Sequence, residues 1–194
     1  MGIAARSVLK DAAMLLAAVL LTAASAVDTP EPAGIWMGPM HGHTPKTLSG
    51  AVVIDAAALD AMMPGHPLLL DVGPGDRKPP DFPKELPWLP THLSIPGAVW
   101  LPGAGAAPLD AAREALFYER VRELTNGDKS KMIVTFCHPE CWGSWNAAKR
   151  LVLEGYTGVH WYPDGIEGWQ DDHETLAVAP DPVWEPKTAS EGEP

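Results

Sequence analysis

The sequence predicts an α/β domain in which a mostly parallel, five-stranded sheet is flanked by helices. Between residues 50 and 175, short apolar runs alternate with stretches of helical period, which is the pattern of a layered α/β domain. The run at residues 67–72 is almost continuously apolar, as is typical of a strand that helices cover on both faces. The chain of 194 residues is long enough for one domain with a substantial core.

Local patterns place the individual elements. Short runs rich in apolar and β-branched residues predict strands at residues 51–54, 67–72, 98–101, 132–136 and 156–161. Stretches of helical period predict helices at 56–62, 110–124, 144–155 and, as a last turn, 164–169. Asp55, Asp110 and Ser144 each stand where a helix begins, and their side chains can accept a hydrogen bond from its first free N–H groups.

The first 26 residues have the features of a secretory signal peptide. Arg6 and Lys10 precede an apolar run at 12–22, which the small residues Ala24-Ser25-Ala26 follow as a cleavage site. The alternative is an uncleaved membrane anchor, for which the apolar run is short. We therefore expect an exported protein that is located in the periplasm once residues 1–26 are removed.

Three further segments lack a periodic pattern. Residues 27–49 are rich in Pro, Gly, Met and His and predict an irregular N-terminal arm. Its His41 and His43 could bind copper together with the nearby methionines, or could simply belong to a flexible, solvated arm. The connection at 73–96 is crowded with prolines, and a loop of that length is usually functional or a packed insertion. Residues 176–194 predict a disordered acidic tail.

Charge and cysteine content limit the class of partner. The net charge of −11 argues against nucleic acid and anionic lipid as partners, and no membrane contact is expected after signal cleavage. The only two cysteines, Cys137 and Cys141, would close a very small loop as a disulfide, so their bond would add little stability. This favours a reactive role for the two cysteines over a stabilising disulfide. The expected partner is a periplasmic protein or a small sulfur compound.

The cysteines lie between a predicted strand and a predicted helix. Cys137 directly follows the strand at 132–136 and precedes the helix at 144–155. A cysteine at this place faces the free N–H groups and the positive end of the helix dipole, which lower the pKa of a thiol. Cys137 is therefore the candidate nucleophile. The alternative is that Cys137 and Cys141 form a structural disulfide or are inert buried thiols.

Five stretches follow one another along the chain as Leu69-Leu70-Asp71-Val72, His92-Leu93-Ser94-Ile95-Pro96-Gly97-Ala98, Phe136-Cys137, Gly155-Tyr156-Thr157-Gly158-Val159 and Asp164-Gly165-Ile166-Glu167-Gly168-Trp169. In this order they resemble the rhodanese (sulfurtransferase) family, over roughly residues 50–172. The resemblance implies a rhodanese-like three-layer domain with a catalytic cysteine at Cys137. It also implies that Asp71 lies near the active-site loop as a further catalytic residue, and the alternative for Asp71 is an ordinary polar residue at the end of a strand.

A narrower resemblance is carried by Cys137-x-x-x-Cys141-Trp142 and Trp161-Tyr162-Pro163-Asp164-Gly165. These stretches are similar to the exported CXXCW-motif proteins associated with PQQ-dependent catabolism, although that name implies two residues between the cysteines and three stand here. The resemblance implies an accessory role in PQQ-dependent alcohol oxidation. No cofactor-pocket motif is present in the sequence, so no cofactor and no metal site is predicted for the domain.

The predicted active-site loop departs from that of active rhodaneses. It consists of Cys137, His138, Pro139, Glu140, Cys141, Trp142, Gly143 and Ser144. Gly143 stands where those enzymes have an arginine, and the loop contains no Lys or Arg. Because thiosulfate is a dianion that a cationic loop binds by charge-assisted hydrogen bonds, we expect poor thiosulfate:cyanide sulfurtransferase activity.

The leading hypothesis is thiol chemistry in which Cys137 attacks as a thiolate or persulfide and Cys141 resolves the intermediate, leaving a reversible disulfide. His138 could lower the pKa of Cys137 or relay a proton. One alternative is a Cu(I)-binding chaperone that uses both thiolates. The other is a non-catalytic adaptor that docks on a quinoprotein dehydrogenase through Trp88 or Trp142.

Overall fold

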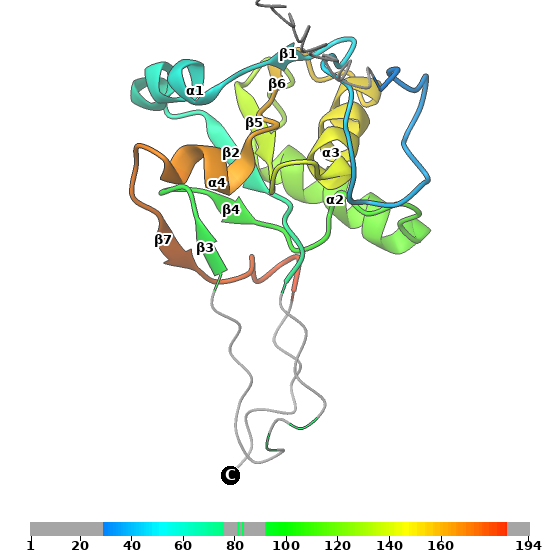
Figure 1. Cartoon of the computed structure of the whole chain (residues 1–194). Coiled ribbons are helices and arrows are strands. Elements are labelled where there is room, and N and C mark those ends of the chain that lie inside the picture. The colour runs from blue at the N-terminus through cyan, green and yellow to red at the C-terminus, as the bar shows by residue number, and fades with distance from the viewer. Residues whose placement is uncertain (1–28, 76–80, 82, 84–91, 186–194) are drawn as a thin grey trace, which may run out of the picture.

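A computed structural model of the chain describes residues 29–75, 81, 83 and 92–185 (Figure 1). Its main sheet has five strands in the order β1-β6-β5-β2-β4, and every neighbouring pair is parallel. The strands are β1 (Val52–Val53), β2 (Leu68–Asp71), β4 (Val99–Trp100), β5 (Ile133–Phe136) and β6 (Val159–Trp161). The predicted α/β fold with a five-stranded parallel sheet is thus confirmed.

Helices cover both faces of this sheet. They are α1 (Ala56–Met62), α2 (Ala111–Leu124), α3 (Trp142–Leu153) and α4 (Gly165–Gln170), with a short 3₁₀ helix η1 (Met63–Gly65) after α1. In Figure 1, α2 and α3 lie on one side of the sheet and α1 and α4 on the other. The hydrophobic core is divided accordingly into two clusters, one on each face.

The central strand β5 supplies side chains to both clusters. Ile133 packs into the cluster beneath α2 and α3, whereas Val134 and Phe136 pack into the cluster beneath α1 and α4. This alternation follows from the period of two along a strand. Cys137 continues it and enters the same cluster as Ile133. Because both faces are covered, the strand is buried throughout, and its one polar side chain, Thr135, donates to the Ser144 carbonyl at 3.1 Å.

Two of the three predicted helix caps are confirmed, and the third is wrong. Asp55 accepts from the Ala58 N–H and Asp110 accepts from the Arg113 N–H, each at 2.8 Å. Helix α3 begins at Trp142, so that its N-cap is Cys141 and not Ser144. The cause is the left-handed turn at Glu140 (φ 54°), which starts the helix earlier than the serine suggests. The Ser144 hydroxyl instead donates to the Cys141 carbonyl at 3.2 Å.

A second, two-stranded sheet is formed by segments that were predicted to be irregular. Strand β3 (His92–Ser94) pairs antiparallel with β7 (Leu176–Val178). The first lies in the predicted loop 73–96 and the second in the predicted disordered tail. Each strand has only three residues, and its partner is far away in the sequence, so no local pattern marks either of them. Residues 76–80, 82 and 84–91 of the loop lie outside the described residues.

The start of the C-terminal segment is anchored to the domain, so the prediction of disorder from residue 176 is wrong for residues 176–185. Trp184 is fully buried, and its indole N–H donates to the Pro102 carbonyl at 2.9 Å. The Arg113 guanidinium lies 3.6 Å from the centre of the Trp184 ring. One large aromatic side chain thus orders a segment whose composition suggested a tail. Residues 186–194 lie outside the described residues.

Asp181 is the polar anchor of this segment. Its carboxylate accepts from Arg120 at 2.7 Å and from the backbone N–H groups of Val183 and Trp184 at 3.0 and 3.1 Å. The hydrogen bond with Asp181 raises the pKa of Arg120. We expect Asp181→Asn to lower the free energy of unfolding by about 1–2 kcal/mol, because charge-assisted hydrogen bonds become neutral ones. Urea denaturation measures this loss. The exposed Asp172→Asn is the control, and equal stability of the two variants would contradict the prediction.

The N-terminal arm contains no helix or strand in residues 29–49, yet it is held against α3. Trp36 stacks on Trp142 with ring centres 4.3 Å apart, and the Trp36 N–H donates to the Asn146 side chain at 2.8 Å. Glu31 accepts from Lys149 at 3.3 Å. The arm is therefore part of the folded domain and not a solvated extension.

The predicted signal peptide, residues 1–26, lies outside the described residues. Within the described part of the chain, no helix combines the length and apolar character that crossing a bilayer requires.

Candidate thiol site

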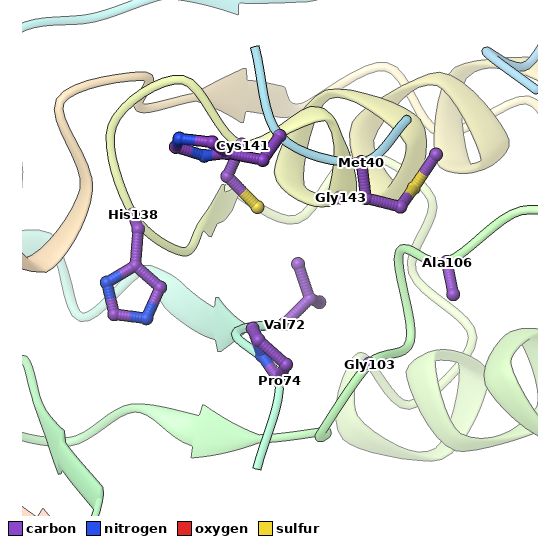
Figure 2. A pocket seen from close by; sticks show the side chains of 9 residues that line it. Met40, Val72, Pro74, Gly103, Ala106, His138, Cys141 and Gly143 are labelled. Atoms are coloured by element: carbon purple, nitrogen blue, oxygen red, sulfur yellow. The ribbon is translucent and has the colours of Figure 1, made fainter. Parts of the chain in front are cut away.

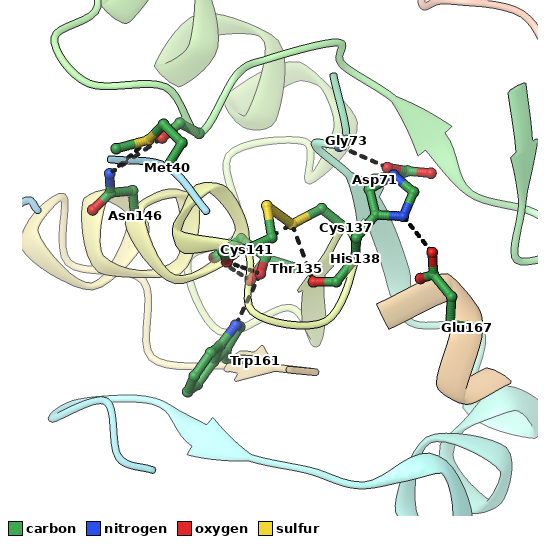
Figure 3. The surroundings of a disulfide bond; sticks show 12 residues. Met40, Asp71, Gly73, Thr135, Cys137, His138, Cys141, Asn146, Trp161 and Glu167 are labelled. Atoms are coloured by element: carbon green, nitrogen blue, oxygen red, sulfur yellow. Dashed lines mark hydrogen bonds and ion pairs between the residues drawn. A yellow bond between two sulfur atoms is a disulfide. The ribbon is translucent and has the colours of Figure 1, made fainter. Parts of the chain in front are cut away.

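Cys137 and Cys141 are joined by a disulfide bond (Figure 3). Cys137 directly follows β5, and Cys141 is the N-cap of α3. Gly165 of α4 packs tightly against the start of the loop, since a Cβ at that residue would lie 2.5 Å from the Cys137 carbonyl oxygen. The Ile166 N–H donates to this same oxygen at 2.9 Å. The disulfide thus joins the end of β5 to the start of α3, and α4 packs against the backbone at Cys137.

The two sulfur atoms have different surroundings. Cys137 is 0% exposed and belongs to the core cluster that contains Leu70 and Trp142, whereas Cys141 is partly exposed. The accessibility that a nucleophilic role would require of Cys137 is therefore absent, and the expectation of an exposed nucleophile at this position is wrong. It fails because Cys137 continues the alternation of β5, which directs its side chain into the core.

The predicted amide cradle around Cys137 is also not formed. The Cys137 sulfur lies 3.8 Å from the carbonyl oxygens of His138 and Cys141. Among the described residues, no backbone N–H donates a hydrogen bond to either sulfur. The first free N–H of α3, that of Trp142, donates to the Met40 carbonyl of the arm at 2.8 Å. Carbonyl oxygens disfavour negative charge, so Cys137 lies in a poor place for a standing thiolate.

A cavity of about 340 Å³ lies beside Cys141 (Figure 2). The Cys141 sulfur points into it. Four segments of the chain contribute to its wall: the arm, the end of β2, the turn before α2 and the cysteine loop. The lining residues are Met40, His41, Val72, Pro74, Gly103, Ala106, His138, Cys141 and Gly143.

The wall formed by residues 103–106 packs directly against the start of α3. A Cβ at Gly105 would lie 1.9 Å from the Gly143 carbonyl oxygen, so only glycine allows this approach. The buried Arg150 fixes the wall, since its guanidinium donates to the carbonyls of Ala104 and Ala106 at 3.3 and 2.8 Å. Arg150 thus holds the backbone of this wall and is not itself one of the residues that line the cavity.

His138 and Glu140 have different partners at the rim of the loop. The His138 Nδ1 lies 2.8 Å from the Glu167 carboxylate, and both side chains are partly exposed (Figure 3). His138 also lines the cavity into which the Cys141 sulfur points. Glu140 pairs with His43 of the arm at 2.7 Å, near the surface. Pro139 is exposed.

Asp71 is completely buried at the end of β2. Its carboxylate accepts hydrogen bonds from the Ser94 hydroxyl at 2.6 Å and the Gly73 N–H at 2.8 Å, and it contacts the His92 Nε2 at 2.7 Å. None of the hydrogen bonds described for Asp71 goes to the cysteine loop. Asp71 therefore ties β2 to β3 and orients the chain that leads to Val72 and Pro74 of the cavity wall.

The alternative of a disulfide with a buried thiol agrees with the bond and with the burial of Cys137, whereas the copper and adaptor predictions gain little from this geometry. Among the described residues, no three His, Cys, Asp or Glu side chains lie close enough together to hold a metal ion. His41 lines the cavity, whereas His43 turns to Glu140. Trp142 is buried beneath Trp36, so it is not an exposed docking side chain. Trp88 lies outside the described residues.

A buried hydroxyl that sequence reasoning missed lies in the core cluster beneath α1 and α4. The Tyr162 hydroxyl has no hydrogen-bond partner among the described residues. Burial raises the pKa of Tyr162 to about 12, and the carboxylates of Asp164, Asp171 and Asp55 act in the same direction. The sequence contained a signal for this, since Tyr162 directly precedes Pro163-Asp164 at the end of a buried strand.

We expect Tyr162→Phe to raise the free energy of unfolding by about 1 kcal/mol, because it removes an unsatisfied buried hydroxyl. The wild-type protein should also lose stability as the pH rises from about 10 to about 12, since the unfolded tyrosine ionises first. Below pH 10 both states keep the proton, so the slope is absent there. Denaturation at several pH values measures both effects, and an equal alkaline loss in Tyr162→Phe would contradict this account.

The family match agrees with this architecture. The rhodanese-like domain family matches residues 55–172. Among solved structures, the chain is similar to BH2092 from Bacillus halodurans, with 24% identity, a TM-score of 0.40, and coverage of 65% of this chain and 77% of that one. No curated protein matches the chain.

Two sulfurtransferases are also among the similar structures. The thiosulfate sulfurtransferase from Pseudomonas aeruginosa has 19% identity and a TM-score of 0.42, over 65% of this chain and 20% of that one. The human single-domain sulfurtransferase TSTD1 has 19% identity and a TM-score of 0.37, over 65% of this chain and 99% of that one. The family match spans more than half of the chain, from the cap of α1 to the end of α4. The chain therefore belongs to the rhodanese-like domain family.

Proposed function

We propose that this protein is an exported thiol protein that exchanges disulfides or transfers sulfur through Cys137 and Cys141, and that Cys141 is the sulfur that partners reach. One observation carries the proposal: the Cys141 sulfur opens into a cavity, while Cys137 is fully buried. Membership of the rhodanese-like family supports sulfur chemistry in general. The roles are the reverse of those expected from the sequence, with Cys141 at the point of entry and Cys137 as the resolving sulfur.

In the oxidised protein, a donor thiolate attacks the Cys141 sulfur and breaks its bond to Cys137. A mixed disulfide forms on Cys141, and Cys137 leaves as a thiolate that takes up a proton. A second donor thiol then attacks the mixed disulfide, so that the donor leaves as a disulfide and both cysteines are thiols. Cys137 needs no access to solvent in either step.

In the reduced protein, the same steps run in reverse. The Cys141 thiolate attacks a disulfide or a persulfide and releases the first thiol. Cys137 then attacks the sulfur of Cys141, restores the internal disulfide, and releases a second thiol or, from a persulfide, hydrogen sulfide. His138 exchanges the protons of these steps with water, and Glu167 holds its ring in place.

The setting proposed for this chemistry is the periplasm, beside PQQ-dependent alcohol oxidation. The support is the signal-like sequence of residues 1–26 and the resemblance of Cys137-x-x-x-Cys141-Trp142 to the CXXCW-motif group. The partner is a periplasmic protein or a small sulfur compound. Thiosulfate is a poor donor in this proposal, since no Lys or Arg lines the cavity.

The proposal is tested by trapping the intermediate. Reduced Cys137→Ser protein is incubated with hydroxyethyl disulfide, and reduced wild type is treated in parallel. Mass spectrometry of peptides should find the adduct on Cys141 in the variant, and wild type should end with the internal disulfide and two released thiols per protein. A persulfide donor should leave one added sulfur atom on Cys141 of the variant.

Failure to form any adduct on Cys141 would overturn the proposal. Stoichiometric uptake of Cu(I) by the reduced protein without disulfide exchange would favour the copper chaperone instead. Full physiological activity of the double variant, Cys137→Ser with Cys141→Ser, would favour the adaptor.

A further inference from the structure

The cavity beside Cys141 is built almost entirely from hydrocarbon groups. Met40 contributes a thioether, Val72 and Ala106 contribute methyl groups, and Pro74 contributes a ring. Only His41 and His138 bring polar side chains, and no Lys, Arg, Asp or Glu is part of the lining. A substrate that reaches the Cys141 sulfur must therefore leave most of its water behind.

The nearest buried cations are already used elsewhere. Arg150 donates to the carbonyls of Ala104 and Ala106 and to Glu114, and Lys149 pairs with Glu31. Moving either of them toward a bound anion would leave buried acceptors without partners, which costs free energy. The cavity thus has no Lys, Arg, Asp or Glu side chain to pair with an ionic substrate.

From this chemistry we propose that the cavity selects small sulfur compounds with an uncharged, apolar body. These are thiols, disulfides or persulfides whose organic group is aliphatic or aromatic. The inference rests on the proposed function, in which Cys141 is the point of entry. An apolar body gains roughly 25 cal/mol for each Å² that it buries, whereas a charged body must be desolvated without compensation. The volume of about 340 Å³ suits a small molecule.

Two features set the limits of this site. The close approach of Gly105 to the Gly143 carbonyl closes one wall, and the hydrogen bonds from Arg150 to the carbonyls of Ala104 and Ala106 hold it there. The arm closes another, because the Gly42 N–H donates to the Glu140 carbonyl at 2.8 Å and the Met40 carbonyl accepts from Trp142 at 2.8 Å. Backbone contacts thus fix the walls that these two segments contribute.

The test compares three disulfide probes on the reduced wild-type protein. They are neutral 2,2′-dipyridyl disulfide, the dianionic 5,5′-dithiobis(2-nitrobenzoic acid) and the dicationic cystamine. Each rate with Cys141 is divided by the rate of the same probe with N-acetylcysteine amide, which removes differences in intrinsic reactivity. We expect the normalised rate of the neutral probe to exceed both others by about tenfold or more. The net charge of −11 would by itself repel the dianionic probe and attract the dicationic one. A slow reaction with cystamine therefore separates selection by the cavity from the effect of the net charge.

A matched pair of variants tests the lining directly. Ala106→Lys should raise the normalised rate of the dianionic probe at least about fivefold, while Ala106→Gln, of similar length and neutral, should leave it near the wild-type value. Equal normalised rates for all three probes, or a preference for either charged probe, would overturn the inference and leave the proposed function standing. If Cys141 reacts with none of the probes, the proposed function itself fails. The wild-type comparison decides the matter even if a variant does not fold.

Discussion

In the reduced state, Cys137→Ser protein should react with iodoacetamide on the order of 1,000-fold faster than Cys141→Ser protein. The first variant keeps the Cys141 thiol beside the cavity, and the second keeps only Cys137, which is fully buried. Alkylation of Cys137 requires local opening of the loop, and an opening free energy of about 4 kcal/mol gives a factor of this size. Mass spectrometry of quenched time points measures both rates.

Unfolded protein provides the control for this comparison. In concentrated urea the two variants should react at similar rates, because both thiols are then solvated. If Cys137 of the folded Cys141→Ser variant reacted as fast as Cys141, the assignment of Cys141 as the point of entry would be wrong. Cys137 would then be the accessible nucleophile that the sequence predicted.

Asp71→Ala should lower the free energy of unfolding by about 4 kcal/mol. The carboxylate satisfies the Ser94 hydroxyl and the Gly73 N–H, both with short hydrogen bonds, and it also holds His92. Truncation leaves several buried polar groups without a partner, and each costs about 1–3 kcal/mol. Chemical denaturation measures the loss. The exposed Glu174→Ala should change stability little and is the matched control.

The conservative Asp71→Asn separates a positioning role from a catalytic one. If Asp71 acts only by holding β2 and β3, this variant should keep the Cys141 alkylation rate within about twofold of the matched protein with Asp71 intact, despite lower stability. A tenfold slower reaction in protein that is still folded would instead place Asp71 in the chemistry, as the family resemblance implied.

Much of the fold could be predicted because the responsible signals are local. The continuous apolar run of β2 and the caps Asp55 and Asp110 act through residues within a few positions of each other. The family match at residues 55–172 agrees with the order of the stretches that carried the resemblance. Strands β3 and β7 escaped prediction because their hydrogen bonds join segments that are distant in sequence.

The candidate site shows the same division. The sequence by itself determined that two cysteines stand between a buried strand and a helix, in a loop without Lys or Arg, on a parallel α/β sheet. Only the tertiary structure decided which sulfur is accessible, since this depends on the phase of β5, on where α3 begins and on the arm that packs over the loop. Whether a side chain is buried depends on segments that are distant in the sequence and pack around it. The residues next to it along the chain therefore do not reveal its burial.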